Sequence, residues 1–302
     1  MSMDADVAVA GGRPEVPRTT FRRTWSRSAH SRQVFVVVGG LIVAVFLVAA
    51  IAPGLLTSHN PSALYSGPAT AAPGSGHLLG TDELGRDFFA RLVYGTRSSL
   101  VMSVLIVAIG AVLGTVVGVT AGLFGGWIDE VLMRVVDLFL SLPGFVLALA
   151  LAAALGRGER SVVIALGIIW WPGYARLFRG MVIAMKHRLH VESARALGAG
   201  NFRIARRHML PFMYGQLNAR ITQDLGYALV NVAGLSFVGL GAQPPSPEWG
   251  SLLQTGLQYV ATAWWLTVFP GLAITLWTVG IAMLGDGLSG FARGERLTGE
   301  RD

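Results

Sequence analysis

The sequence predicts an all-α polytopic membrane protein with six transmembrane helices and both termini in the cytoplasm. Hydrophobic residues make up 53% of the 302 residues and charged residues only 14%, whereas soluble domains carry about 25% charged residues. Several apolar stretches reach about 18 residues, the length that spans a bilayer. With the N-terminus inside, 19 of the 24 Lys and Arg residues fall on the cytoplasmic side, as the positive-inside rule requires.

The N-terminal third of the sequence predicts a tail, an anchor and a loop. Residues 1–33 are rich in Arg and lack periodicity, which indicates a disordered basic cytoplasmic tail. Residues 34–56 form an N-terminal anchor helix, because their apolar run is too long and begins too late for a signal peptide. Residues 57–97 are expected to be an extracytoplasmic loop that ends in a short entrance helix near Asp87–Tyr94.

Residues 98–285 predict a core of five further helices, and residues 286–302 a cytoplasmic tail. The core includes a cytoplasmic loop at residues 186–215. The expected spans are residues 98–124, 138–155, 161–185, 221–241 and 264–285. The span at 161–185 is the least regular, because Pro172-Gly173 interrupts it, and a re-entrant segment there reduces the total to five spans.

The first span of this core contains glycines at four-residue steps, namely Gly110, Gly114, Gly118 and Gly122. Repeated GxxxG spacing lets another helix approach closely in lipid. The ladder indicates a tight crossing in a translocation core or at a subunit contact, and ordinary packing within the chain explains it equally well.

Several kinds of chemistry are not expected of this chain. It has no Cys, which excludes disulfides and thiolate metal sites, and its His spacing predicts no metal site. It has no GxxxxGK[ST] phosphate loop and only one lysine, Lys186, so no ATP site and no catalytic residues are predicted. The acidic residues, including Asp224 and Asp286, are expected at span ends, whereas secondary carriers often bury a charge within a span. The net charge of +7 is spread along the chain, so no nucleic-acid partner is expected.

The segment HVESARALGAGNFRIARRHMLPF, residues 190–212, predicts a basic helical hairpin on the cytoplasmic side. Val191, Ala194 and Leu197 share one face of its first helix, and Gly198 and Gly200 end that helix. The second helix is expected to begin at an N-cap, close at a proline and separate an apolar face from an arginine face. Asn201 is the expected N-cap and Pro211 the closing proline. The apolar face consists of Phe202, Ala205 and Met209, and the basic face of Arg203, Arg206 and Arg207. The hairpin either lies on anionic lipid, reads DNA, or docks a cytoplasmic protein; tethering at both ends argues against DNA.

Four motifs carry a resemblance to a known family. ESARALGAGNFRIARRHMLP resembles the EAA loop of ABC-transporter permeases. HLLGTDELGRDFFARLVYGTRSSL, MRVVDLFLSLPG and LSFVGLGAQPPSPEWGSLL resemble the C-type second permease of the dipeptide/oligopeptide/nickel family, and together the matches cover most of residues 77–253. The chain departs from the family where it has Val232 beside Asn231, and where GDGLSGFARGER replaces the family's GDxLRDxLDP, so that Asp286 lacks the later acids of that motif. These departures leave the cargo open.

The resemblance implies a type I ABC importer permease core in the cell membrane of a prokaryote. Its expected partners are a second homologous permease subunit, two cytoplasmic ATPase domains, an extracytoplasmic solute-binding protein and membrane lipid. No cofactor is bound by this chain; ATP and Mg belong to the partner ATPase subunits. The expected cargo is a di- or oligopeptide, with nickel or another small solute as the alternative. The alternative from another functional class is a secondary carrier or a scaffolding membrane subunit.

The resemblance also implies roles for particular residues. The ATPase-coupling residues are Glu192, Ala194, Arg195, Gly198, Ile204 and Pro211. The polar residues expected nearest a pathway are Gln223, Tyr227, Asn231 and Ser236, with Gln254 and Gln258 further along. Residues that either shape the external entrance or form a plain capped turn are Gly80, Thr81, Asp82, Gly85, Arg86 and Asp87.

Overall fold

The described part of the chain, residues 18–74 and 76–298 of a computed structural model, is helical with no strand beyond one isolated bridge. A six-residue π-helical segment, Ile204–Met209, joins α7 to α8 without a break in the helical path. The α-helices are α1 Arg18–Ile51, α2 Phe88–Phe124, α3 Gly126–Ser141, α4 Gly144–Leu155, α5 Glu159–Met185, α6 Leu189–Ala196, α7 Asn201–Arg203, α8 Leu210–Phe237, α9 Trp249–Leu257 and α10 Trp265–Thr298.

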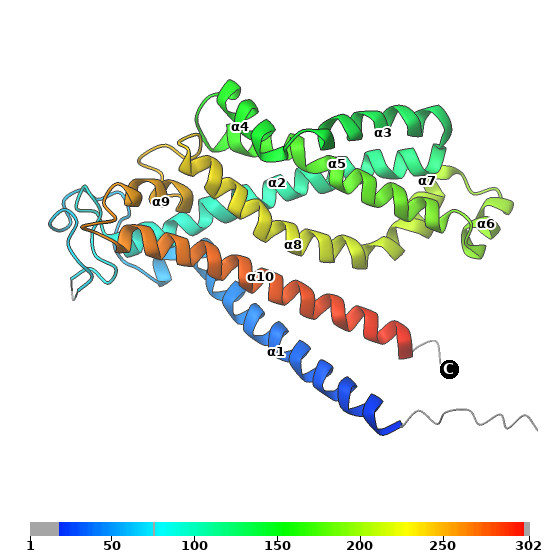
Figure 1. The fold of residues 1–302 in the computed structure, drawn as a ribbon, viewed down its shortest axis with the longest axis horizontal. Helices are drawn as coiled ribbons and strands as arrows, with labels where there is room; N and C mark the ends of the chain where they lie inside the picture. The colour runs from blue at the N-terminus through cyan, green and yellow to red at the C-terminus, as the bar shows by residue number, and fades with distance from the viewer. Residues whose placement is uncertain (1–17, 75, 299–302) are drawn as a thin grey trace, which may run out of the picture.

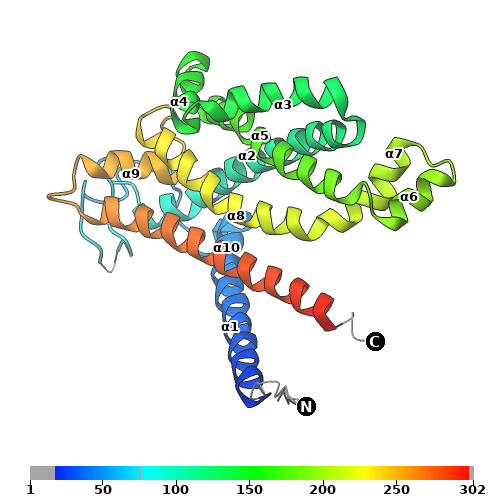
Figure 2. The same cartoon turned by 45° about the vertical axis from the view of Figure 1, so that its right-hand side comes forward.

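The long helices form an elongated bundle with different structures at its two ends (Figure 1). The loop before α2 lies at one end together with α9, and the α6–α7 hairpin lies at the other. The C-terminal end of α10 and the N-terminal end of α1 point away from the α9 end in both views (Figure 2). The hairpin therefore lies toward the end of the bundle where the sequence places the cytoplasm.

The number of spans differs from the predicted six. In the part of the chain that the structure describes, four helical segments are long and apolar enough to cross a membrane, and α3 with α4 adds a fifth if this bent pair counts as one span. The predicted span 221–241 falls mostly in α8, which does not meet this criterion: besides Arg220 and Asp224 it contains several Gln and Asn residues. Nevertheless α8 packs along α2, α5 and α10 as part of the bundle.

Two prolines with similar local signals have opposite effects on their helices. Leu142 is extended before Pro143, so α3 and α4 meet at a bend of 89°, because the residue before a proline disfavours the helical conformation. The predicted span 138–155 is therefore not one continuous helix, since it covers the end of α3, the bend and α4. Pro172 instead lies buried inside the continuous α5, so the re-entrant alternative for 161–185 is wrong as well.

The ends of the predicted segments also shift. Residues 18–33, expected as part of a disordered tail, belong to α1, whereas residues 1–17 lie outside the described part of the chain. The entrance helix and the following span are one helix, α2, whose N-cap Asp87 accepts a hydrogen bond from Ala90 N at 2.7 Å. The tail from residue 286 continues α10 as far as Thr298.

The glycine ladder of α2 is a contact surface for α5 within this chain. A Cβ added at Gly110 would lie 2.7 Å from Trp170 Cβ, and one at Gly118 would lie 2.9 Å from Phe178 Cβ. A Cβ at Gly114 would meet the backbone of Trp171. Since these contacts lie on both sides of Pro172, they hold the two halves of α5 in line against α2.

We expect Gly114→Ala to destabilise the bundle and Gly180→Ala to leave it unchanged. The added methyl at Gly114 has no space, and overpacking costs about 1–3 kcal/mol. Gly180 lies in α5 with no heavy atom within 4 Å of a new Cβ, so only the favourable helix propensity of Ala acts there. Thermal unfolding of the purified variants in detergent measures the difference, and equal midpoints for the two would contradict the packing role.

Candidate functional site

The turn of the hairpin is a helix C-terminus completed by Gly198. This residue has φ +83°, Ala199 N donates to Ala194 O at 3.0 Å, and Gly198 N donates to Arg195 O at 2.9 Å. These two bonds with a left-handed glycine form the Schellman arrangement that ends helices. The predicted turn at Gly198 is confirmed, whereas the N-cap of α7 is Gly200 rather than Asn201.

One side of the hairpin packs under the bundle. Val191, Ile204 and Met209 are fully buried, and Ala194 is nearly so. The first three belong to a hydrophobic cluster that includes Phe178 of α5. The inner side of the hairpin thus shares a hydrophobic cluster with a long helix of the core.

The other side of the hairpin is exposed, including two apolar residues predicted to be packed. Leu197 is 88% exposed and Phe202 is 78% exposed, because both lie next to the turn, where the chain leaves the helical faces extrapolated from the sequence. Glu192 and Arg195 are also exposed, and Glu192 Oε1 lies 3.8 Å from His187 Nδ1. The tip of the hairpin therefore combines charged and apolar side chains that are free of contacts with the bundle.

Pro211 does not close the second helix of the hairpin as predicted. It is the second residue of α8, which directly follows the π-helical segment, so the helical path continues past it. The helical path runs from Asn201 through the π-helical segment to Phe237. The turn is consequently connected to the length of α8 without an intervening loop.

A cavity of about 180 Å³ lies beside α8, between that helix, α5 and the bend of α3 and α4. Of the predicted pathway residues, Tyr227 and Asn231 line it, together with Trp170 and Phe145. Asn231 Nδ2 donates to Tyr227 O at 2.8 Å. The other predicted pathway residues do not line this cavity. Gln223 is exposed, Ser236 is buried against Gly241 and Gly250, and Gln254 and Gln258 belong to the α9 region.

An ion pair borders this cavity that the sequence reading missed. Arg220 lines it, and its Nε donates to Asp224 Oδ2 at 3.0 Å. The guanidinium carbon lies 5.7 Å from the centre of the Tyr174 ring. Asp224 is buried in the middle of α8 rather than at a span end, because the helix begins at residue 210 and not at 221. The signal that could have found the pair is its i, i+4 spacing.

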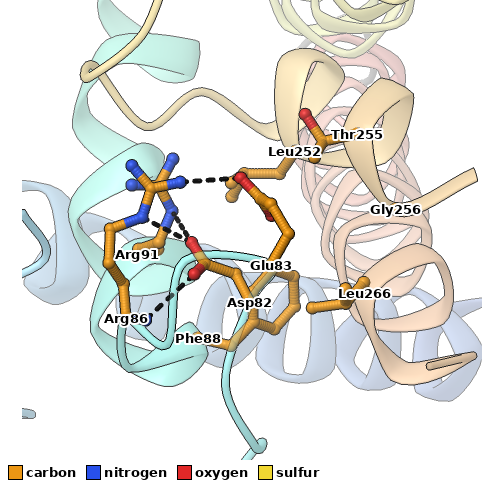
Figure 3. Close-up of a pocket in the computed structure, with 9 residues that line it drawn as sticks. All are labelled: Asp82, Glu83, Arg86, Phe88, Arg91, Leu252, Thr255, Gly256 and Leu266. Atoms are coloured by element: carbon orange, nitrogen blue, oxygen red, sulfur yellow. Dashed lines mark hydrogen bonds and ion pairs between the residues drawn. The ribbon is translucent and has the colours of Figure 1, made fainter. Parts of the chain in front are cut away.

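The loop predicted to shape the external entrance is built around the buried carboxylate of Asp82 (Figure 3). Its Oδ2 accepts from Arg86 Nε at 2.6 Å and lies 3.2 Å from Arg91 Nε, and its Oδ1 accepts from Arg86 N at 2.9 Å. Arg86 Nη2 also donates to Glu83 Oε1 at 2.9 Å. Asp82, Arg86 and Arg91 are each at most 5% exposed, so these charges are paired away from water.

The backbone around this cluster requires two glycines. Gly80 has φ +78° and Gly85 has φ +68°, and a Cβ at either one would meet a backbone carbonyl of residues 67–71. Trp265 Nε1 of α10 donates to Thr81 O at 3.3 Å, while Asp87 caps α2 and lies 2.8 Å from His77 Nδ1. The segment is therefore both a capped turn and a packed loop that joins α2 to α10.

Two further carboxylates fasten the segment between α8 and α9 to the core. Glu248 is fully buried, caps α9 through Gly250 N and Ser251 N, and accepts from Ser99 Oγ at 3.2 Å. Burial raises the pKa of Glu248, and these hydrogen bonds act in the opposite direction. Glu159 Oε1 accepts from Ser98 Oγ at 2.7 Å and from Ser246 Oγ at 3.1 Å. Ser98 and Ser99, which are neighbours in α2, thus hydrogen-bond to two different carboxylates. The spacing of these residues in the sequence did not predict this pairing.

Known proteins are similar to this chain in sequence and in fold. Residues 114–291 match the family described as binding-protein-dependent transport system inner membrane component. The glutathione transport system permease protein GsiD of Pectobacterium atrosepticum is 38% identical over 272 residues, covering 90% of each chain. The dipeptide transport system permease protein DppC of Alkalihalophilus pseudofirmus is 38% identical over 257 residues, covering 83% of each chain. The probable D,D-dipeptide transport system permease protein DdpC of Escherichia coli is 36% identical over 252 residues, covering 83% of this chain and 85% of its own.

The fold is also that of a solved transporter. A chain of the inward-facing MetNI methionine ABC transporter superimposes with a TM-score of 0.53, covering 66% of this chain and 94% of its own at 21% identity. The relatives are matched over most of their length. The chain therefore belongs to the family of binding-protein-dependent transport system inner membrane components, and it is an inner-membrane permease subunit of an ABC importer.

Proposed function

We propose that this permease subunit forms half of a pathway for di- or oligopeptides, delivered by an extracytoplasmic solute-binding protein. The support is that the relatives are named as transporters of a dipeptide, a D,D-dipeptide and glutathione, which is itself a small peptide. A second homologous permease subunit supplies the other half. Nickel is less well supported, because the cavity beside α8 is lined by aromatic, amide and guanidinium groups and by no typical metal ligand.

The energy for transport comes from two cytoplasmic ATPase domains, which bind ATP and Mg. The sequence contains no phosphate loop, so this chain has no ATPase site of its own. The observation that carries this part of the proposal is the two-sided hairpin. Its exposed side presents Glu192, Arg195 and Leu197 to a partner, while its buried side belongs to the same hydrophobic cluster as residues of α5. A displacement of the hairpin by the ATPase is thereby transmitted to α5 and α8.

Uptake of a radiolabelled dipeptide by cells that lack the gene for this chain tests the cargo. Expression of the wild-type chain should restore uptake, whereas restored nickel uptake without dipeptide uptake would contradict peptide cargo. Tyr227→Ala should lower uptake about fivefold, a change of about 1 kcal/mol, because Tyr227 lines the cavity. Gln223→Ala is the matched control, one helical turn away and outside the cavity, and should change uptake less than twofold.

A further inference from the structure

Two adjacent grooves lie on the cytoplasmic side of the bundle, beside the second helix of the hairpin. The basic groove, of about 460 Å³, is lined by Phe202, Arg203, Arg206, Arg207 and Pro211. The apolar groove, of about 520 Å³, lies between the C-terminal part of α2 and the start of α8. Phe202 and Arg206 belong to the walls of both grooves, so the two are continuous.

The basic groove carries uncompensated positive charge. Arg203, Arg206 and Arg207 are all exposed, and within the described residues no carboxylate oxygen lies within 4 Å of their guanidinium groups. Arg176 and Arg179, by contrast, each pair with an Asp of α3. Three guanidinium groups held on one short helical stretch repel one another, and an anion with several acceptor oxygens relieves this repulsion through charge-assisted hydrogen bonds.

The apolar groove lies beside the cytoplasmic end of the membrane-spanning helix α2. One wall comes from the last ten residues of α2, including Val116, Val119 and Phe124, and the other includes Tyr214 of α8. Trp127, just beyond α2, is 74% exposed. Aromatic side chains of this kind mark the interface between hydrocarbon and headgroups. The apolar groove therefore faces the acyl region, and the three arginines lie at the level of the headgroups.

We propose that the two grooves together bind an anionic phospholipid of the cytoplasmic leaflet. The phosphate contacts Arg203, Arg206 and Arg207, and an acyl chain lies in the apolar groove between α2 and α8. Basic pockets between helices on the cytoplasmic side are suited to anionic headgroups. The continuity with an apolar groove favours a lipid over a free phosphate. Because the arginines lie between the Gly198 turn and α8, the bound lipid steadies the hairpin in its position under the bundle.

Native mass spectrometry of the purified full-length chain tests this site with two probes of equal acyl composition. Dioleoyl phosphatidylglycerol should bind at least tenfold more tightly than dioleoyl phosphatidylcholine. The triple substitution Arg203→Gln, Arg206→Gln and Arg207→Gln should abolish this preference. The matched control removes the same charge at exposed arginines outside both grooves, Arg134→Gln, Arg188→Gln and Arg195→Gln, and should retain it. If the triple variant does not fold, the single change Arg206→Glu should still lower the preference at least threefold.

A second variant separates a lipid from a free anion. Thr120→Trp fills the apolar groove and should weaken binding of both lipids without touching the arginines. Equal loss of preference in the control triple variant would overturn the site, as would displacement of the bound lipid by millimolar inorganic phosphate. Loss of phosphatidylglycerol when the ATPase subunits are bound would assign the grooves to that protein partner instead. None of these outcomes depends on the identity of the transported cargo.

Discussion

Gly198→Val should uncouple ATP hydrolysis from transport while leaving the permease in the membrane. Valine at φ +83° is strained, since the left-handed conformation costs L-residues roughly 1–2 kcal/mol and branched residues more. The Schellman bonds of Ala199 and Gly198 then break, and the exposed tip of the hairpin moves relative to α5. We expect at least tenfold less ATPase to co-purify with this variant, and no stimulation of hydrolysis by loaded binding protein.

Two control variants separate backbone strain from lost space at this turn. No heavy atom lies within 4 Å of a Cβ added at Gly198 or at Gly200, and Gly200 has an ordinary φ of −70°. Gly200→Val should therefore couple normally, and Gly198→Asn should retain most coupling, because Asn tolerates the left-handed region. Normal co-purification and coupling by Gly198→Val would show that the hairpin does not dock the ATPase.

Asp82→Ala should destabilise the external end of the molecule by about 3–5 kcal/mol, the usual cost of removing one partner from a buried ion pair. Arg86 and Arg91 are each 5% exposed, so they cannot recover solvation without opening the loop. Limited proteolysis from outside right-side-out vesicles should cut residues 57–87 much faster in the variant, and thermal unfolding in detergent should begin at a lower temperature.

Glu83→Ala is the control for this cluster. The Glu83 side chain is 22% exposed and its carboxylate pairs with Arg86, which keeps its partner Asp82 in the Glu83 variant. The loss of Glu83 should therefore cost no more than about 1 kcal/mol, as is usual for solvent-accessible pairs. Equal proteolysis of the Asp82 and Glu83 variants would contradict a central role for the Asp82 carboxylate in holding this loop.

Features that depend on local backbone geometry could be predicted from the sequence. The left-handed turn at Gly198 follows from a glycine after an amphipathic helix, and the close approach of another helix follows from the four-residue glycine steps of α2. The opposite effects of Pro143 and Pro172 on their helices could not be predicted in the same way. Tertiary packing accompanies both outcomes, because α5 packs straight along α2, whereas α3 and α4 each pack against α5 on their own side of the bend.

The candidate site was predictable only in part for the same reason. The buried faces of Val191 and Met209 follow helical periodicity, but the exposure of Leu197 and Phe202 depends on how the turn sits under α5. Arg220 and Asp224 were visible as an i, i+4 pair, yet starting the span at residue 221 made Asp224 look terminal. The Asp82 cluster brings together residues whose pairing depends on the three-dimensional path of the loop.

The most direct test of energy coupling through this chain is dipeptide uptake into proteoliposomes that contain both permease subunits, with the ATPase subunits on the lumenal side and the binding protein outside. We expect uptake only when the ATPases and lumenal ATP are both present, and no uptake by the permeases under a proton or sodium gradient alone. Gradient-driven uptake of the dipeptide by this chain in the absence of the ATPases would contradict ATP-driven import and favour a secondary carrier.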